Sequence, residues 1–126
     1  MKIVVAIARI LMGLAFFVLG LNGFLNFIPS GPMPTGLAGD FINALLKSHY
    51  VWVVAFCQVI GGLLLLINRY VTLGLVLLGP VIVNILAYHL AMDLKGIVPG
   101  LVMTVCWAIV AWSARKNLAP IFSPRV

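Results

Sequence analysis

Residues 51–91 read VWVVAFCQVIGGLLLLINRYVTLGLVLLGPVIVNILAYHLA, and this stretch decides the fold. It consists of two long apolar runs that are joined by a short polar turn, Asn68-Arg69-Tyr70. A helix that crosses a bilayer needs about 20 predominantly apolar residues. Two adjoining runs of this kind therefore predict a helical hairpin inside a membrane.

The composition of the whole chain supports the same interpretation. The chain has 126 residues, of which 64% are hydrophobic and 8% charged, and its mean hydropathy is +1.25. So few charges cannot cover a water-facing surface, so we expect an integral membrane protein whose main partner is the lipid bilayer. The net charge of +6 does not indicate nucleic-acid binding, because the basic residues form no cluster on a polar face.

The apolar runs predict a single, all-α domain that forms a four-transmembrane-helix bundle. The expected spans cover approximately residues 3–28, 51–67, 71–91 and 97–114. Residues 29–40, PSGPMPTGLAGD, are rich in proline and glycine and are expected to form a loop. Asp40 is the expected N-cap of a short amphipathic helix at residues 41–46, which would lie on the membrane surface before the second span.

The basic residues predict the orientation of the bundle, because cytoplasmic segments carry an excess of Lys and Arg. With both termini in the cytoplasm, six of the eight basic residues lie on or near the inside: Lys2, Arg9, Arg69, Arg115, Lys116 and Arg125. The other two, Lys47 and Lys95, lie outside with both acids, Asp40 and Asp93. We therefore expect both termini to be cytoplasmic.

Four glycines are candidates for close helix packing, since small residues let membrane helices approach each other. Gly13 and Gly20 share one face of the first span, and Gly61 and Gly62 lie in the second. Arg9 lies on the same face as Gly13 and Gly20. Its guanidinium either snorkels to the membrane surface or pairs with a buried acceptor on another helix.

Polar residues in the spans are the candidates for a ligand site, since polar groups are costly in hydrocarbon. Most of them fall in the expected outer half of the bundle. Asn22 and Asn26 are spaced i, i+4 and therefore stack on one side, where they act as interhelical glue or line a cavity. Gln58 shares a face with Gly62 and is expected to point between helices.

The third span carries four further candidates on two faces. Asn84 and Tyr88 share one face, and His89 and Asp93 share another. The faces point well apart, so all four line one cavity only if the bend expected at Pro80, or the helix end, reorients them.

His89 with Asp93 one turn later has two interpretations. It is an oriented imidazole that bonds a quinone carbonyl or passes a proton, or an interfacial histidine bonded to Asp93 and water. We expect no metal, because His49, His89 and Asp93 supply three ligands only if their helix ends meet. No residue pattern identifies a catalytic group.

Several short motifs, in this order and spacing, carry a resemblance to a known family. They are Arg9-x-x-Met-Gly13, Phe16-Phe17, Gly20-Leu21-Asn22-Gly23, Gln58-Val-Ile-Gly61-Gly62, a basic turn at Arg69, and Gly79-Pro80 through Asn84 to His89. With these motifs the chain resembles the DoxX-like family of small bacterial membrane proteins. The resemblance implies a four-helix bundle in the bacterial inner membrane and a link to quinone-dependent oxidoreductase systems. Many members have a glutamate where this chain has Gln58, which argues against a proton-linked role there.

Two functions remain open from the sequence. The first is a membrane subunit of a quinone-linked redox system, which binds a flat apolar ligand in the outer half and works with a redox partner protein. This function rests on the resemblance. The second is a non-catalytic membrane protein that binds lipid or small molecules or anchors partner proteins. The sequence indicates neither an oligomeric state nor a cofactor beyond the implied quinone.

Overall fold

A computed structural model describes residues 1–28 and 32–125, and within these ranges every regular element is a helix. In chain order the elements are α1 (Lys2–Leu25), α2 (Gly36–Lys47), α3 (Val51–Leu66), α4 (Val71–Met92), the 3-10 helix η1 (Leu94–Gly96), α5 (Ile97–Ser113), α6 (Arg115–Leu118) and the 3-10 helix η2 (Ala119–Phe122). The prediction of an all-α chain is confirmed. α1 ends at Leu25 rather than at residue 28.

Three segments are long and apolar enough to cross a membrane: Lys2–Leu25, Val71–Met92 and Leu94–Ser113. α3 has 16 residues, which corresponds to about 24 Å of helix and is shorter than a hydrocarbon core of about 30 Å. α2 and α3 reach the required length only as a pair, and this pair is bent by 80°. The described residues therefore contain three candidate spans, or four if the bent pair is one span.

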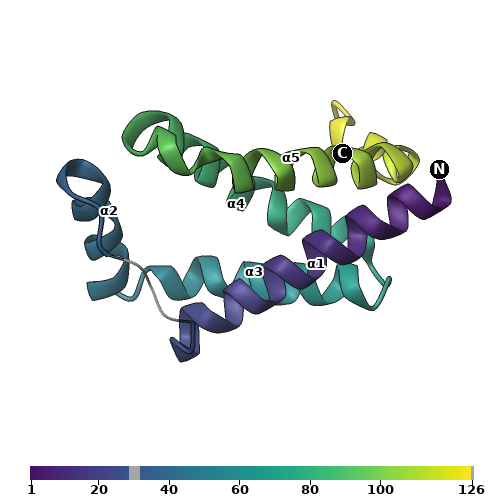
Figure 1. Cartoon of the computed structure of the whole chain (residues 1–126). Coiled ribbons are helices and arrows are strands. Elements are labelled where there is room, and N and C mark those ends of the chain that lie inside the picture. Colours follow the sequence, from purple (N-terminus) through teal and green to yellow (C-terminus); the bar gives the residue numbers. More distant parts are fainter. Residues whose placement is uncertain (29–31, 126) are drawn as a thin grey trace.

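The four long helices form a ring. α1 packs against α3 and α5, and α4 packs against the same two helices. Both termini lie at one end of this bundle, together with the turn between α3 and α4, and α2 lies at the opposite end (Figure 1). The start of α1 and the last helices of the chain therefore lie at the same end of the bundle.

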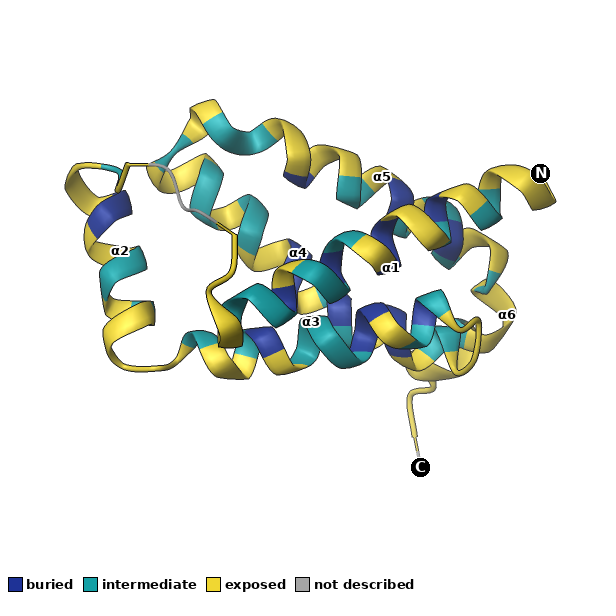
Figure 2. Ribbon diagram, turned by 60° about the horizontal axis from the view of Figure 1, so that its bottom comes forward, coloured by how far each residue is buried: buried dark blue, intermediate teal, exposed yellow. Residues whose placement is uncertain are grey.

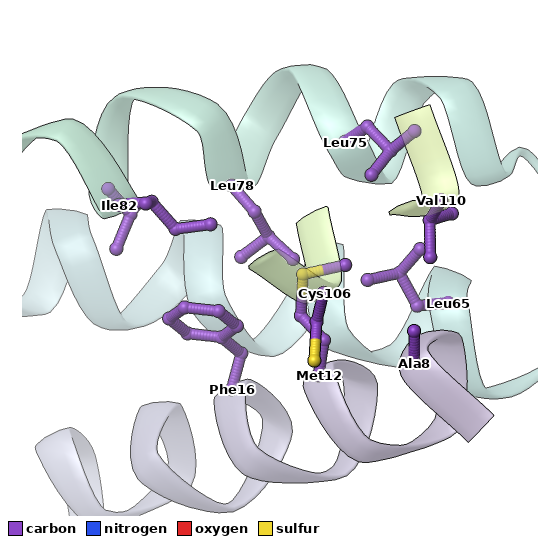
Figure 3. Close-up of a cluster of buried hydrophobic side chains, with 10 residues drawn as sticks. Ala8, Met12, Phe16, Leu65, Leu75, Leu78, Ile82, Cys106 and Val110 are labelled. Atoms are coloured by element: carbon purple, nitrogen blue, oxygen red, sulfur yellow. The ribbon is translucent and has the colours of Figure 1, made fainter. Parts of the chain in front are cut away.

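The core lies where these helices face each other. Met12 and Phe16 of α1 are buried against Leu65 of α3 and Leu78 of α4, and Cys106 of α5 joins the same cluster (Figure 3). The cluster is made of large aliphatic, aromatic and sulfur-containing side chains. Dense packing of this kind is the main attraction between helices in a membrane, where lipid tails are as apolar as the core.

The four candidate packing glycines lie at contacts between helices. A Cβ atom added at Gly62 would lie 2.6 Å from the Phe17 nitrogen and 2.7 Å from the Gly13 oxygen, so these two backbones touch. A Cβ atom at Gly20 would lie 2.8 Å from the backbone nitrogen of Val59 on α3. One at Gly61 would lie 2.7 Å from the Leu78 side chain on α4. α3 thus uses adjacent glycines to approach α1 on one side and α4 on the other.

Arg9 binds an acceptor on a neighbouring helix. Its Nη1 donates hydrogen bonds to the carbonyl of Leu65 and, at 3.4 Å, to that of Leu66. These carbonyls belong to the last turn of α3, where helices leave carbonyls without intrahelical partners and carry partial negative charge. Of the two alternatives for Arg9, the structure shows pairing with an acceptor on another helix.

The outer surface of the bundle is strongly apolar. Buried residues are confined to the inner faces of the helices, and exposed residues cover their outer faces (Figure 2). The exposed side chains include Ile7 and Leu14 of α1, Phe56 of α3, Val83 of α4 and Val105 of α5. Several long apolar helices with such a surface fit a multi-pass membrane protein.

The short helix before α3 differs from the prediction. α2 begins at Gly36, so Asp40 lies inside it and is not its N-cap, and the predicted loop is helical from residue 36 onward. The N-cap is Thr35. Two glycines explain the early start: Gly36 has a φ of 70°, and Gly39 sits so close to the Pro34 oxygen that no Cβ would fit. Residues 29–31 of the predicted loop lie outside the described residues.

Candidate functional site

A cavity of about 270 Å³ lies between α2, the start of α3 and the second half of α4. Three of the candidate residues line it: Asn84, Tyr88 and His89. The sequence predicts Asn84 and Tyr88 on one face of this helix and His89 on another. Residues of both faces line the cavity. Asp93 is not part of its lining.

Tyr88 is the central residue of this cavity. Its ring stacks on Phe41 of α2, with centroids 5.6 Å apart, and meets the edge of His89 at 5.0 Å. Its hydroxyl oxygen is buried and has no hydrogen-bond partner among the described residues. A buried hydroxyl without a partner costs about 1–3 kcal/mol, so native structures seldom keep one without a reason.

His89 is held by the backbone at the end of its own helix. Its Nδ1 lies 3.0 Å from the backbone carbonyl oxygen of Asp93, so these two residues make contact through the backbone of Asp93. A carbonyl only accepts, so Nδ1 is the donor and Nε2 of the neutral ring is left as an acceptor. The reason is geometric: α4 ends at Met92, and the carbonyl that follows turns back toward the ring.

Asn84 also bonds to its own helix. Its Nδ2 donates to the carbonyl of Pro80 at 2.8 Å, and the side chain is otherwise exposed at the wall of the cavity. This bond fixes the orientation of the amide and leaves Oδ1 as a further acceptor. Asn84 Oδ1 and His89 Nε2 are thus left as acceptors at the cavity. The donors are the second Nδ2 hydrogen of Asn84 and the hydroxyl of Tyr88, which is covered in the empty cavity.

The cavity has a second wall that the sequence did not indicate. It is made of apolar and aromatic residues of α2 and of the start of α3: Phe41, Ile42, Leu45, Tyr50 and Val54. One sequence feature could have indicated this wall: the i, i+4 spacing of Phe41 and Leu45, which puts both side chains on one face of a helix. The expected position of this helix on the membrane surface gave no reason to turn that face toward α4.

Asn22 and Asn26 have a structural role at the end of α1. The Asn22 Oδ1 accepts a hydrogen bond from the backbone nitrogen of Ile28 at 2.8 Å. Asn26 is the C-cap, with a left-handed φ of 52° and an N–H that donates to the Asn22 carbonyl. Neither residue lines the cavity beneath α2, and the Asn22 side-chain oxygen instead holds the chain that leaves the end of its own helix.

Gln58 and Asp93 also lie outside the cavity. Gln58 is half-buried on α3, between Ala55 and Gly62, which both face α1. Among residues 1–28 and 32–125, no three His, Cys, Asp or Glu side chains come close enough together to hold a metal ion.

The chemistry of the cavity suits a flat molecule with polar oxygen atoms. An aromatic and aliphatic wall can cover a ring, and polar atoms on one side can orient it. Comparison with family profiles, curated proteins and solved structures finds no match for this chain.

Proposed function

We propose that the chain is a DoxX-like protein of the bacterial inner membrane and binds a quinone, or a ligand of the same class, in the cavity beneath α2. The observation that carries this proposal is the buried hydroxyl of Tyr88, which has no partner among the described residues. A quinone carbonyl is an acceptor on a flat ring. It would accept a hydrogen bond from this donor once the side chains that cover the hydroxyl shift to admit it, while the ring lies against the aromatic wall.

The size of the cavity favours a single ring. At about 270 Å³ it is just below the usual volume of ligand sites, which range from about 300 to 1,000 Å³. An isoprenoid tail would leave through the open side and lie among the lipid chains. The acceptor atoms of His89 and Asn84 would bind the hydroxyl groups of the reduced quinol, so the site has partners for both redox states.

The proposed orientation has four spans and cytoplasmic termini, with α2 and α3 together making the bent second span. The end of the bundle that holds the termini carries Lys2, Arg9, Arg69, Arg115, Lys116 and Arg125. An excess of basic residues marks the cytoplasmic side, which supports this orientation and puts the quinone cavity in the outer half. A redox partner protein would supply or receive the electrons, because the proposed site only binds and orients the quinone.

A pair of ligands tests the proposal directly. Decylubiquinone has the carbonyls, whereas decylbenzene has a ring and the same chain without them. We expect decylubiquinone to raise the unfolding temperature of the detergent-purified protein and decylbenzene to have little effect. Equal effects of the two would favour the alternative function, in which the cavity holds a lipid chain or another apolar molecule. No effect of any quinone would contradict the proposed function.

A further inference from the structure

A second, larger cavity lies at the opposite end of the bundle, where the termini meet. Its volume is about 640 Å³, and it is lined by the start of α1, the turn before α4, and the end of α5 with α6. It is open to the surface and shares no lining residue with the cavity beneath α2. Its chemistry is different, because three basic side chains line it: Lys2, Arg9 and Arg115.

Two of these cations are held in place by contacts that leave donors free. The Nη1 of Arg9 is bonded to the carbonyls at the end of α3, which leaves its Nε and Nη2 groups for another acceptor. The guanidinium of Arg115 lies over the ring of Trp112, 4.6 Å from its centroid, and its Nη1 donates to the Trp112 carbonyl at 2.8 Å. Both guanidinium groups are therefore oriented before any ligand arrives.

The chain provides no acidic side chain to neutralise this end. Its only two acids are Asp40 in α2 and Asp93 after α4. The elements that hold them, α2 and the turn between α4 and α5, lie at the other end of the bundle (Figure 1). Three cations around one cavity repel each other, and an anion that enters the cavity relieves this repulsion.

The remaining walls of the cavity identify the kind of anion. Val5, Val71 and Ile109 give it an apolar side, and Asn68 and Asn117 add amide groups near the cations. A small soluble anion would use the cations and leave the apolar side exposed. A molecule with an anionic head and a hydrocarbon chain uses both.

We propose that this cavity binds the phosphate group of an anionic phospholipid, with Lys2, Arg9 and Arg115 around the phosphate and the acyl chains along the apolar wall. Basic pockets between membrane helices are suited to such headgroups, and arginine is the side chain whose donors best match phosphate oxygens. The proposal is independent of the quinone site. It depends only on the insertion of the chain in a membrane.

The test compares lipids with the same acyl chains and different headgroups. Dioleoyl phosphatidylglycerol and dioleoyl phosphatidylcholine are titrated into the full chain in dodecyl maltoside, and bound lipid is counted by native mass spectrometry. We expect phosphatidylglycerol to bind and phosphatidylcholine to bind at least roughly 10-fold more weakly, since its phosphate is offset by a choline cation. Equal binding of the two lipids would overturn the proposal.

Matched double variants locate the site. Lys2→Gln with Arg115→Gln removes two cavity cations, and both side chains are exposed, so the fold is expected to persist. Lys116→Gln with Arg125→Gln removes the same charge from exposed residues that do not line the cavity. We expect the first pair to weaken phosphatidylglycerol binding roughly 10- to 30-fold and the second to change it little. Equal losses, or no loss in the first pair, would overturn the assignment to the cavity.

Inorganic phosphate distinguishes a lipid site from a site for a free anion. We expect millimolar phosphate to leave the unfolding temperature of the purified protein unchanged, and phosphatidylglycerol to raise it. If phosphate alone raises it as much as the lipid does, the acyl chains contribute nothing and the lipid proposal is overturned.

Discussion

The ring of Phe41 on α2 stacks on the ring of Tyr88 on α4, with the centroids 5.6 Å apart and the planes inclined by 28°. Such pairs contribute about 0.5–1.5 kcal/mol beyond the area they bury. This contact turns α2 from a free surface helix into one wall of a cavity. The buried hydroxyl on the same Tyr88 ring is the main argument for a ligand.

The contact between Gly62 and α1 predicts a large effect of a single methyl group. Gly62→Ala should lower the free energy of unfolding by about 1–3 kcal/mol, because the new Cβ would meet backbone atoms of Phe17 and Gly13 that cannot move aside. Gly62→Leu should be worse. Unfolding in detergent with a graded denaturant is the measurement.

Gly79 supplies the matched control for this change. A Cβ atom there would lie 3.6 Å from the Trp107 ring, which is ordinary contact. Gly79→Ala avoids a clash with another helix but places a Cβ atom before Pro80, which disfavours helical backbone, so it should not stabilise α4 and should cost less than Gly62→Ala. Equal stability of the two alanine variants would show that α1 and α3 are not in contact at Gly62.

The bond between Arg9 and the end of α3 predicts a role in stability. Arg9→Met should cost about 1–3 kcal/mol, because the carbonyls of Leu65 and Leu66 lose a charged donor in a partly buried place. Arg69→Met removes an exposed cation from the adjacent turn and should stay within about 0.5 kcal/mol. If both variants unfold like the parent, Arg9 extends into solvent and does not bind α3.

The position of Asn22 predicts that its substitution loosens the end of α1 without changing quinone binding. Asn22→Leu should speed amide exchange at Ile28, whose N–H loses its acceptor. It should leave quinone affinity unchanged, and so should Gln58→Leu, because neither residue lines the cavity. A loss of quinone affinity in either variant would move the ligand toward α1 and α3.

The long helices could be predicted because each corresponds to a continuous run of apolar residues in the sequence. The runs that became α4 and α5 are continuous and apolar, and their bounds differ from the prediction by no more than one residue at each end. The end of α1 was not predictable in this way. It depends on Asn26 adopting a left-handed conformation and on Asn22 reaching the nitrogen of Ile28, which a count of apolar residues does not detect.

The candidate site was predictable only on the α4 side. Asn84, Tyr88 and His89 are polar residues in an apolar run, which singles them out. The wall from α2 depends on the 80° bend between α2 and α3 and on the early start of α2 at Gly36. The bend depends on how the helices pack, and the early start depends on the positive φ of Gly36 and the close approach of Gly39 to Pro34. No apolar pattern therefore indicates that Phe41 meets Tyr88.

The most direct test of the account is the quinone affinity of Tyr88→Phe, measured by titration of decylubiquinone into the purified protein. Tyr70→Phe is the control, since Tyr70 is exposed at the other end of α4. We predict that Tyr88→Phe binds roughly 3- to 10-fold more weakly than the parent, as expected for one lost hydrogen bond, and that its empty form is at least as stable. Tyr70→Phe should bind like the parent. If Tyr88→Phe binds decylubiquinone as tightly as the parent does, the Tyr88 hydroxyl is not a ligand donor and the central claim is wrong.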